Sequence, residues 1–395
     1  MNTSFKTKIQ EETLPTLYSC PRVILRWATG LGKSKMTIDL VNHTLGSLRD
    51  PKIAFIVAER SHIKNWQEEF EKWDLKAKPL ILCYASLKKL KDTSVDILVL
   101  DEAHHVFTEK RLAILETLKA QYVYLLSATL SVKRIIDIES IYGKFTTSTV
   151  TLKEAIRQNA LPEPRVNLIP LELDNVTPNQ TIVIGKSKNA PVIKWENRGK
   201  YIYKNVPCII KCTEKQKYLF LTEKMEYWKR RYELSHNQMF HNIWVNTGST
   251  RKRFLGELKT EKVKKLISKF SRKKRFICFC ASIAQAEDID PHNTISSKRP
   301  SSLNQQIIDA FNNKQLHRLY AIGMATEGLN LNNIEVGIIV QLDGKERLFV
   351  QKFGRSLRAE DPVSYIFYYK DTQDEVYLRN ALENIDNKYL KTISL

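Results

Sequence analysis

The sequence predicts an α/β protein with two parallel-sheet domains and a basic α+β region between them, and three observations predict this. Short apolar runs alternate with helical stretches in the first third of the chain, the same alternation returns in the last third, and Lys and Arg are concentrated between the two. Apolar strands alternating with helices are typical of parallel sheets covered on both faces. We expect a first domain over 1–160, a basic middle region over 161–265 and a second domain over 266–395.

Five apolar runs in the first third have the length and β-branched content of buried strands. They are Val23–Leu25, Ile53–Val57, Leu80–Tyr84, Ile97–Leu100 and Tyr122–Leu126. In parallel α/β sheets, binding and catalytic residues collect where the strands end at their carboxyl side. Every run except the third is followed at once by polar or glycine-containing residues, so we expect a site at these strand ends.

The first run leads into residues 27–34, Trp-Ala-Thr-Gly-Leu-Gly-Lys-Ser. Glycines in such a loop let backbone N–H groups surround phosphates. Lys33 would reach the β and γ phosphates, and the Ser34 hydroxyl would ligate magnesium. The strict pattern has glycine where this chain has Trp27, and a plain strand-to-helix turn is the alternative interpretation. The residues expected to bind nucleotide here are Thr29, Gly30, Gly32, Lys33 and Ser34.

The fourth run ends in Asp101-Glu102-Ala-His104-His. Two carboxylates at the tip of a buried strand are costly unless they hold a cation or polarise water. One carboxylate for magnesium and a second for the attacking water is what nucleoside triphosphate hydrolysis requires. The fifth run ends in Ser127-Ala-Thr129, for which a polar turn after a core strand is the plain interpretation.

These three segments together resemble the phosphate loop, the Asp-Glu-Ala-His motif and the Ser-Ala-Thr motif of superfamily 2 helicases and translocases. The resemblance implies two RecA-like domains in tandem, with ATP and Mg²⁺ in the cleft between them. It implies that Asp101 ligates the metal and that Glu102 positions or deprotonates the attacking water. It also implies that His104, Ser127 and Thr129 couple the nucleotide to nucleic-acid binding, although capping is an alternative role for the histidine.

Two further segments resemble motifs of the same superfamily. Gln10 precedes Lys33 by 23 residues and is followed by Leu-Pro at 14–15, which is similar to the adenine-reading motif of DEAD-box proteins. Residues 55–70 resemble motif Ia of Snf-type translocases, in which a loop contacts the nucleic-acid backbone. Within them, Trp66 and Phe70 stand at helical spacing, and we interpret both as core positions.

The last third of the chain predicts a second parallel sheet. Residues 323–331, Gly-Met-Ala-Thr-Glu-Gly-Leu-Asn-Leu, resemble motif V of the superfamily, and the resemblance implies that Gly328 and Asn330 contact the nucleotide. The predicted strands are Phe276–Phe279, Leu316–Ile322, Val336–Leu342 and Tyr365–Tyr369.

Residues 351–358, Gln-Lys-Phe-Gly-Arg-Ser-Leu-Arg, resemble motif VI. Arg355 and Arg358 are three residues apart, so they lie on one face of a helix. The alternative interpretation is that both are ordinary charged surface residues. The resemblance implies that both stabilise charge on the transferred phosphoryl group as arginine fingers, and that Gln351 senses the γ-phosphate.

The formal net charge is +20, and it is concentrated in the middle of the chain. Residues 180–275 hold 25 Lys or Arg against 7 Asp or Glu, a local excess of +18. Tyr and Trp are interleaved with these charges, a mixture that suits phosphate neutralisation and base stacking. A solvated helical surface is the alternative. The residues expected to contact nucleic acid are Arg251, Lys252, Arg253, Trp228 and Trp244.

The leading hypothesis is therefore an ATP-driven helicase or double-strand translocase acting on DNA. The alternatives are an RNA helicase or remodeller, a non-catalytic nucleic-acid-binding or annealing protein on a helicase scaffold, and an ATPase subunit whose target is set by a partner protein. The absence of a long apolar run predicts no membrane span, and the lack of an apolar signal-peptide core predicts a cytoplasmic protein. We also expect it to function as a monomer. Six scattered cysteines predict reduced thiols, because a zinc site would need a spacing that they lack.

Overall fold

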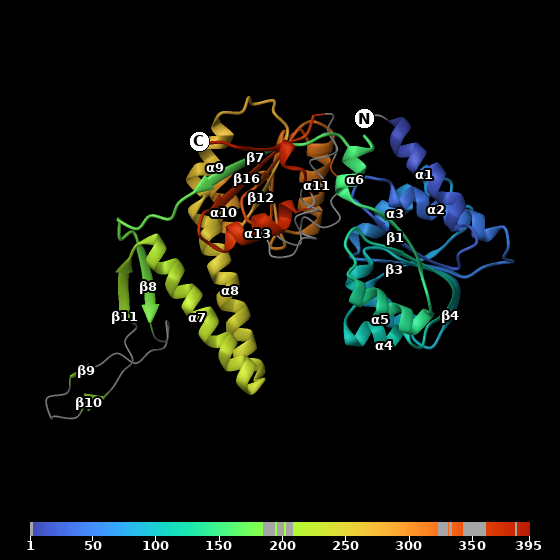
Figure 1. The fold of residues 1–395 in the computed structure, drawn as a ribbon, viewed down its shortest axis with the longest axis horizontal. Coiled ribbons are helices and arrows are strands. Elements are labelled where there is room, and N and C mark those ends of the chain that lie inside the picture. Colours follow the sequence, from blue (N-terminus) through green and yellow to red (C-terminus); the bar gives the residue numbers. More distant parts are fainter. Residues whose placement is uncertain are drawn as a thin grey trace.

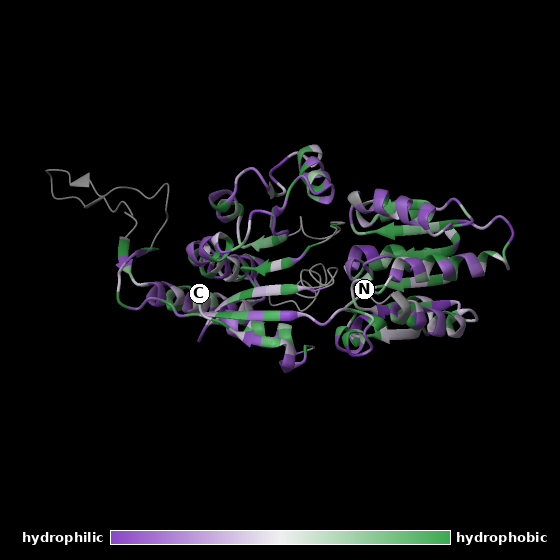
Figure 2. Cartoon of the chain, turned by 90° about the horizontal axis from the view of Figure 1, so that it is seen from above, coloured by the Kyte–Doolittle hydropathy of each residue, from purple (hydrophilic) through white to green (hydrophobic). Residues whose placement is uncertain are grey.

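Two parallel sheets lie side by side in the computed structural model, and a long helical hairpin projects from the second (Figure 1). The structure describes residues 3–184, 194–195, 201–202, 208–322, 331, 334–342, 361–383 and 385–395. Seen from above, hydrophobic residues are concentrated in the strands and hydrophilic residues on the outer helices (Figure 2). None of the helices in these residues is long and apolar enough to span a membrane.

The first sheet has six parallel strands in the order β3-β2-β4-β5-β1-β6. The five strands expected from the sequence are confirmed. The sixth, β6, was not expected because its Thr-Thr-Ser-Thr-Val sequence is polar, and its side chains are exposed or half-buried at the edge of the sheet. The strands are β1 (Arg22–Trp27), β2 (Ile53–Val57), β3 (Leu80–Cys83), β4 (Ser94–Leu100), β5 (Lys119–Leu126) and β6 (Thr146–Val150).

Helices cover both faces of this sheet, with α1, α2 and α3 on one side and α4 and α5 on the other (Figure 1). Neighbouring residues of one strand therefore enter different cores: Val23 packs in the cluster that includes α2, and Ile24 in the cluster that includes α5. The helices are α1 (Thr3–Leu17), α2 (Lys33–Leu45), α3 (Ser61–Lys72), α4 (Glu109–Leu115) and α5 (Val132–Tyr142), with 3₁₀ turns η1 (Tyr84–Leu90) and η2 (Ala103–His105).

The second sheet has seven parallel strands in the order β13-β14-β12-β15-β16-β7-β17. All four strands expected in the last third are confirmed. The strands are β7 (Arg165–Leu171), β12 (Phe276–Cys280), β13 (Thr294–Ile295), β14 (Arg318–Ile322), β15 (Val336–Ile339), β16 (Val363–Tyr369) and β17 (Leu390–Thr392). Its helices are α9 (Thr260–Ser268), α10 (Ile283–Ile289), α11 (Ser301–Asn312) and α13 (Gln373–Leu382), with the 3₁₀ turn η4 (Asn387–Tyr389).

Strand β7 differs from the expected domain organisation, because it lies within the predicted basic region 161–265. It pairs with β16 along its whole length, from Arg165 opposite Val363 to Leu171 opposite Tyr369. The second sheet thus includes a strand from the first residues of the predicted basic region. The second sheet begins at Arg165, and the rest of the basic region lies between β7 and β12 in the chain.

Helix α6 (Leu152–Arg157) connects the two sheets. It begins with a capping box, in which Thr151 and Glu154 exchange side-chain and backbone hydrogen bonds. Its apolar residues Leu152 and Ile156 belong to one hydrophobic cluster that continues into both sheets. On its polar side, Lys153 and Arg157 form ion pairs with Asp386, which lies beyond α13 in the second domain.

Two antiparallel helices, α7 (Glu214–Ser235) and α8 (Gln238–Leu258), form the projecting hairpin. The turn is closed by His236 in the left-handed conformation and by Asn237, whose side chain accepts a hydrogen bond from the Met239 N–H. Strands β8 (Gln180–Ile184) and β11 (Cys208–Cys212) pair antiparallel beside its base, and the short β9 (Lys194–Trp195) and β10 (Tyr201–Ile202) pair with each other.

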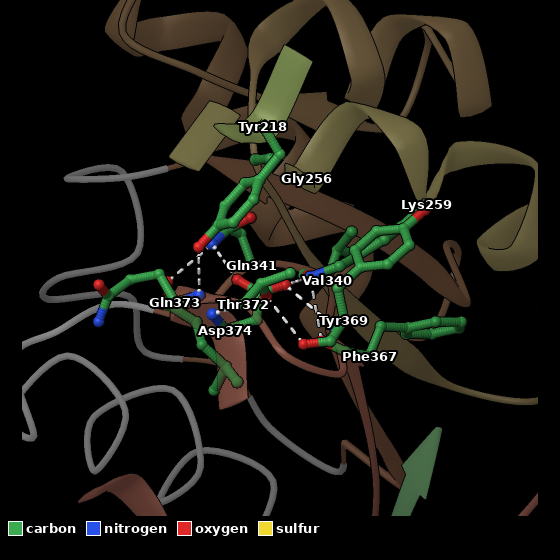
Figure 3. Close-up of polar contacts among 12 residues, drawn as sticks. Tyr218, Gly256, Lys259, Val340, Gln341, Phe367, Tyr369, Thr372, Gln373 and Asp374 are labelled. Carbon is green, nitrogen blue, oxygen red and sulfur yellow. Dashed lines mark hydrogen bonds and ion pairs between the residues drawn. The ribbon is translucent and has the colours of Figure 1, made fainter. Parts of the chain in front are cut away.

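A buried ion pair joins the base of the hairpin to the second sheet (Figure 3). Lys259, at the junction of α8 and α9, lies 2.5 Å from the Asp374 carboxylate at the start of α13, and neither side chain is exposed. The ammonium also donates to the carbonyls of Val340 and Phe367. Burial lowers the pKa of Lys259, and the Asp374 carboxylate opposes that shift. Removing one partner of such a pair would leave an unpaired buried charge, which is costly. The pair therefore holds the end of α8 against the second sheet.

Candidate active site

The phosphate loop follows β1 and leads into α2. Gly30 and Gly32 have φ values of 95° and 85°, in the left-handed region that favours glycine. A side chain at Gly32 would also collide with Gln10, whose Nε2 would be 2.4 Å from the new Cβ atom. Because the first N–H groups of α2 are directed along the helix axis, the loop and the helix together suit an anion.

Trp27 occupies the position where the strict loop pattern has glycine. Its side chain is fully buried, and the indole N–H donates to the Ser148 hydroxyl on β6 at 2.9 Å. The indole is therefore directed toward the neighbouring strand β6. Lys33 lies at the start of α2, with its ammonium 3.0 Å from the Trp27 carbonyl oxygen.

The structure brings Gln10 of α1 to this loop. Its side chain is 4% exposed, and its Nε2 donates to the Leu31 carbonyl at 2.7 Å. The sequence placed this glutamine near the phosphate loop only through a family resemblance. Contact with the loop agrees with that location, and the reading of adenine stays a prediction.

Asp101 directly follows β4, and its carboxylate is held in place on both oxygens. The backbone N–H of Glu102 donates to Oδ1 at 2.9 Å, and the indole N–H of Trp66 donates to Oδ2 at 2.8 Å. Desolvation raises the pKa of Asp101, and the neighbouring Glu102 carboxylate raises it further. A nearby cation would stabilise the charged form of the Asp101 carboxylate and so offset both effects. This electrostatic environment suits a metal.

Glu102 has a left-handed backbone with φ of 45°, which is uncommon outside glycine and is often found at functional sites. Its Oε2 lies 3.3 Å from Nδ1 of His104, which is buried in the 3₁₀ turn η2. Desolvation raises the pKa of Glu102, but the contact with His104 and the charge of Lys33 outweigh it and lower the pKa to about 2. Glu102 is therefore ionised throughout the neutral range.

Helix α3 contributes residues that the sequence did not assign to the site. Trp66 packs against Phe55 and Phe70, as expected of a core position, and its indole N–H donates a hydrogen bond to Asp101. One turn earlier, His62 is 6% exposed and interacts electrostatically with both carboxylates, which opposes the rise in the pKa of Asp101 and contributes to the fall in the pKa of Glu102. The hydroxyl of Tyr84 donates to the Asp101 carbonyl at 2.9 Å. The i, i+4 spacing of a histidine and a tryptophan was the one sequence signal for this support.

The Ser-Ala-Thr segment follows β5, which lies between β4 and β1. Ser127 is fully buried, its N–H donates to the Leu25 carbonyl of β1, and its hydroxyl accepts from the Thr129 N–H at 3.3 Å. Ser127 thus lies between the strand of the phosphate loop and the strand of Asp101, which suits the expected coupling role. That role stays a prediction.

The residues expected to contact nucleic acid are in different environments. Arg251 is buried, where it donates to Thr222 and Gln373, so its burial argues against contact with nucleic acid. Lys252 is half-buried and Arg253 is exposed. The local excess of +18 therefore overstates the surface charge, because Arg251, Lys259 and Arg275 are internal.

Trp228 and Trp244 are both half-buried near the end of the hairpin. Each ring contacts the opposite helix: Trp228 lies 5.4 Å from Phe240, and Trp244 lies stacked 6.1 Å from Tyr232. Part of each ring therefore holds α7 and α8 together, and the rest faces solvent.

Five expected site residues lie outside the described residues. They are Gly328, Asn330, Gln351, Arg355 and Arg358. Their roles stay predictions.

Residues 255–360 match the helicase conserved C-terminal domain. The fold is similar to the Hef helicase domain of Pyrococcus furiosus, with a TM-score of 0.52, 12% identity, and coverage of 94% of this chain and 97% of that one. It is also similar to Saccharomyces cerevisiae Dbp5 bound to RNA and ADP BeF3, with a TM-score of 0.60, 12% identity, and coverage of 98% and 89%. The chain has a helicase-type fold.

This helicase-type fold confirms the expected class of two RecA-like parallel-sheet domains in tandem. At 12% identity, the two solved structures bear on the fold alone. No curated protein matches the sequence.

Proposed function

We propose that this chain is a nucleic-acid-dependent ATPase that couples ATP hydrolysis to movement along nucleic acid, as a DNA helicase or double-strand DNA translocase. The observation that carries the proposal is the convergence of two elements at neighbouring strand ends. The phosphate loop with Lys33 follows β1, and the Asp101–Glu102 pair follows β4, with only β5 between them. The charge of Lys33 opposes the rise in the pKa of Asp101 and contributes to the fall in the pKa of Glu102.

The donor set fits a magnesium ion. Ser34 at the first turn of α2 offers a hydroxyl and Asp101 a carboxylate, and Mg²⁺ takes oxygen ligands of these kinds. When bound with ATP, the metal would neutralise charge on the phosphates. Lys33 would bind the β and γ phosphates. Glu102, which is ionised at neutral pH, would orient the attacking water and accept its proton.

The second domain would complete the site. The resemblance of residues 351–358 to motif VI supports Arg355 and Arg358 as arginine fingers and Gln351 as the γ-phosphate sensor. Gly328 and Asn330 would contact the nucleotide from motif V. With half of the groups in each domain, hydrolysis would depend on domain closure, and alternate gripping by the two domains would move the chain along a strand.

Basic and aromatic side chains of the basic middle region support binding of a polyanion. Exposed Arg253 and the partly exposed rings of Trp228 and Trp244 remain candidates, with Lys252 beside them. We favour DNA over RNA, because residues 55–70 and motif V resemble DNA translocases. We also expect a monomer in the cytoplasm.

The test is the ATPase rate with single-stranded DNA, duplex DNA and RNA in parallel. Stimulation by duplex DNA supports a translocase, stimulation by single strands supports a helicase, and stimulation by RNA alone supports the RNA alternative. Wild-type protein that binds nucleic acid without hydrolysing ATP would leave the annealing protein as the better description. A requirement for a stoichiometric co-purifying protein would favour an ATPase subunit.

A further inference from the structure

Trp66 is both a residue of the hydrophobic core and a hydrogen-bond donor to the candidate active site. Its ring is 4% exposed and packs against Phe55 and Phe70, with ring centroids 5.1 Å and 5.6 Å away. This packing fixes the plane of the indole, and hence the direction of its N–H. The N–H ends on Oδ2 of Asp101 at 2.8 Å.

Four hydrogen bonds determine the position and the orientation of Asp101. Its backbone N–H donates to the Ile56 carbonyl at 2.9 Å, and its carbonyl accepts from the Tyr84 hydroxyl at 2.9 Å. These two bonds hold the main chain and leave the side-chain torsions free. The torsions are set by the donors on the two oxygens, the Glu102 N–H and the Trp66 N–H.

Both donors leave part of the carboxylate available. Each carboxylate oxygen has two acceptor lone pairs, so one on each oxygen remains for a metal or its water. The Glu102 N–H belongs to the residue that directly follows Asp101 in the same segment. Trp66 belongs to α3, whose position is set by packing on the sheet, so it is the donor that ties the carboxylate to the rigid domain core.

We propose that Trp66 is a positioning residue for the metal site, and that its indole N–H fixes the Asp101 carboxylate in the orientation that receives the nucleotide-bound divalent cation. This inference rests on the proposed ATPase and adds a residue that does not touch substrate. Partners that orient a metal ligand in this way are worth about 10- to 100-fold in metal affinity.

The same helix region supplies a matched comparison. The indole N–H of Trp73, just beyond α3, donates to Oε2 of Glu69 at 2.7 Å. Both tryptophans thus donate to a carboxylate, but Glu69 is not part of the site. Replacing each by Phe removes one such bond and retains an aromatic ring, so the pair separates metal positioning from a general loss of hydrogen bonding.

The test measures Mn²⁺ binding to the full chain in the presence of ADP, by electron paramagnetic resonance, for wild type, Trp66→Phe and Trp73→Phe. We expect Trp66→Phe to bind Mn²⁺ about 10-fold more weakly and Trp73→Phe to match wild type. Thermal unfolding checks that each variant is folded. Binding by folded Trp66→Phe within two-fold of wild type, or equal losses in both variants, would overturn the inference.

A measurement that does not require Trp66→Phe covers the case in which that variant does not fold. In ¹⁵N-labelled protein with ADP, Mg²⁺ should shift one indole N–H signal among the six tryptophans, and that signal should remain in Trp73→Phe. If no indole signal responds although Mg²⁺ binds, the inference fails. If wild type shows no Mg²⁺-dependent nucleotide binding at all, the proposed ATPase itself fails.

Discussion

At the residue scale, Asp101 and Glu102 are adjacent carboxylic acids whose pKa values are shifted in opposite directions by their surroundings. Desolvation and the Glu102 charge raise the pKa of Asp101, whereas His104 and Lys33 lower that of Glu102 against its own desolvation. Pairs whose pKa values are separated by their surroundings often divide two roles between them. Here the division suits a metal ligand and a base that stays ionised.

Replacing the base should separate binding from turnover. We expect Glu102→Gln to bind ATP with wild-type affinity and to lose about 100- to 10,000-fold in hydrolysis, because the amide cannot accept the proton of the attacking water. Steady-state ATPase rates and equilibrium nucleotide binding measure the two effects. Retained turnover would exclude Glu102 as the base.

Stability in acid should also depend on Glu102. Its pKa falls from 4.5 in an unfolded chain to about 2 in the fold, so the folded state binds this proton less readily. The contribution of Glu102 is therefore fully present above about pH 4.5 and is lost as the pH falls through the folded pKa. In urea unfolding, the advantage of wild type over Glu102→Gln should shrink between pH 5 and pH 3. A constant difference would contradict the lowered pKa.

At the element scale, helix α8 has two different halves. Its N-terminal half packs against α7 in the hairpin. Its C-terminal half, which ends at Leu258, is held to the second sheet by the Lys259–Asp374 pair. One glycine lies in each half. A Cβ atom at Gly248 would have Met225 Sδ 3.4 Å away, whereas one at Gly256 would be 2.1 Å from the Ala281 Cβ atom.

The same substitution should therefore have opposite effects in the two halves. Gly256→Ala overpacks the contact with the sheet and should destabilise the protein by about 1–3 kcal/mol. Gly248→Ala has room and removes backbone freedom from the unfolded chain, so it should stabilise by about 0.5–1 kcal/mol. Denaturant unfolding of both variants measures the signs. Equal effects would contradict the close packing at Gly256.

At the scale of the whole molecule, a polar clasp holds the two domains at α6. Asp386 accepts from Lys153 at 2.8 Å and from Arg157 at 3.2 Å, and nearby Glu163 accepts from Lys388 at 3.2 Å and Tyr389 at 2.7 Å. These pairs are partly exposed, so each is individually weak. They are well suited to opening when the domains change their relative position.

Loosening the clasp should expose α6 to protease. Asp386→Asn weakens both ion pairs, and we expect trypsin to cleave at Lys153 and Arg157 about two- to five-fold faster. Asp361→Asn is the matched control, since it breaks an ion pair with Arg165 inside the second domain. If both variants are cleaved at the same rate, the clasp does not restrain α6.

Local sequence patterns predicted the strands, and with them the positions of the candidate site residues that follow the strands directly. Apolar runs determine strands through burial, and Lys33 and Asp101 are positioned by the ends of β1 and β4. The hydrogen bonds of Trp66 and Arg251 were not predictable, because the partners of each lie on other elements, distant in the chain. The strand β7 was missed as part of the second sheet for the same reason: its partner β16 lies nearly 200 residues away.

The final strand β17 has a practical consequence. It pairs with β7 at the end of the seven-stranded sheet, through Leu390, Lys391 and Thr392. A truncation that removes this strand would leave β7 as the outer strand, with its unpaired N–H and carbonyl groups open to pairing with another chain. Shortened versions of this protein should therefore aggregate, and fusion partners are better attached by a linker that leaves residues 390–392 in register.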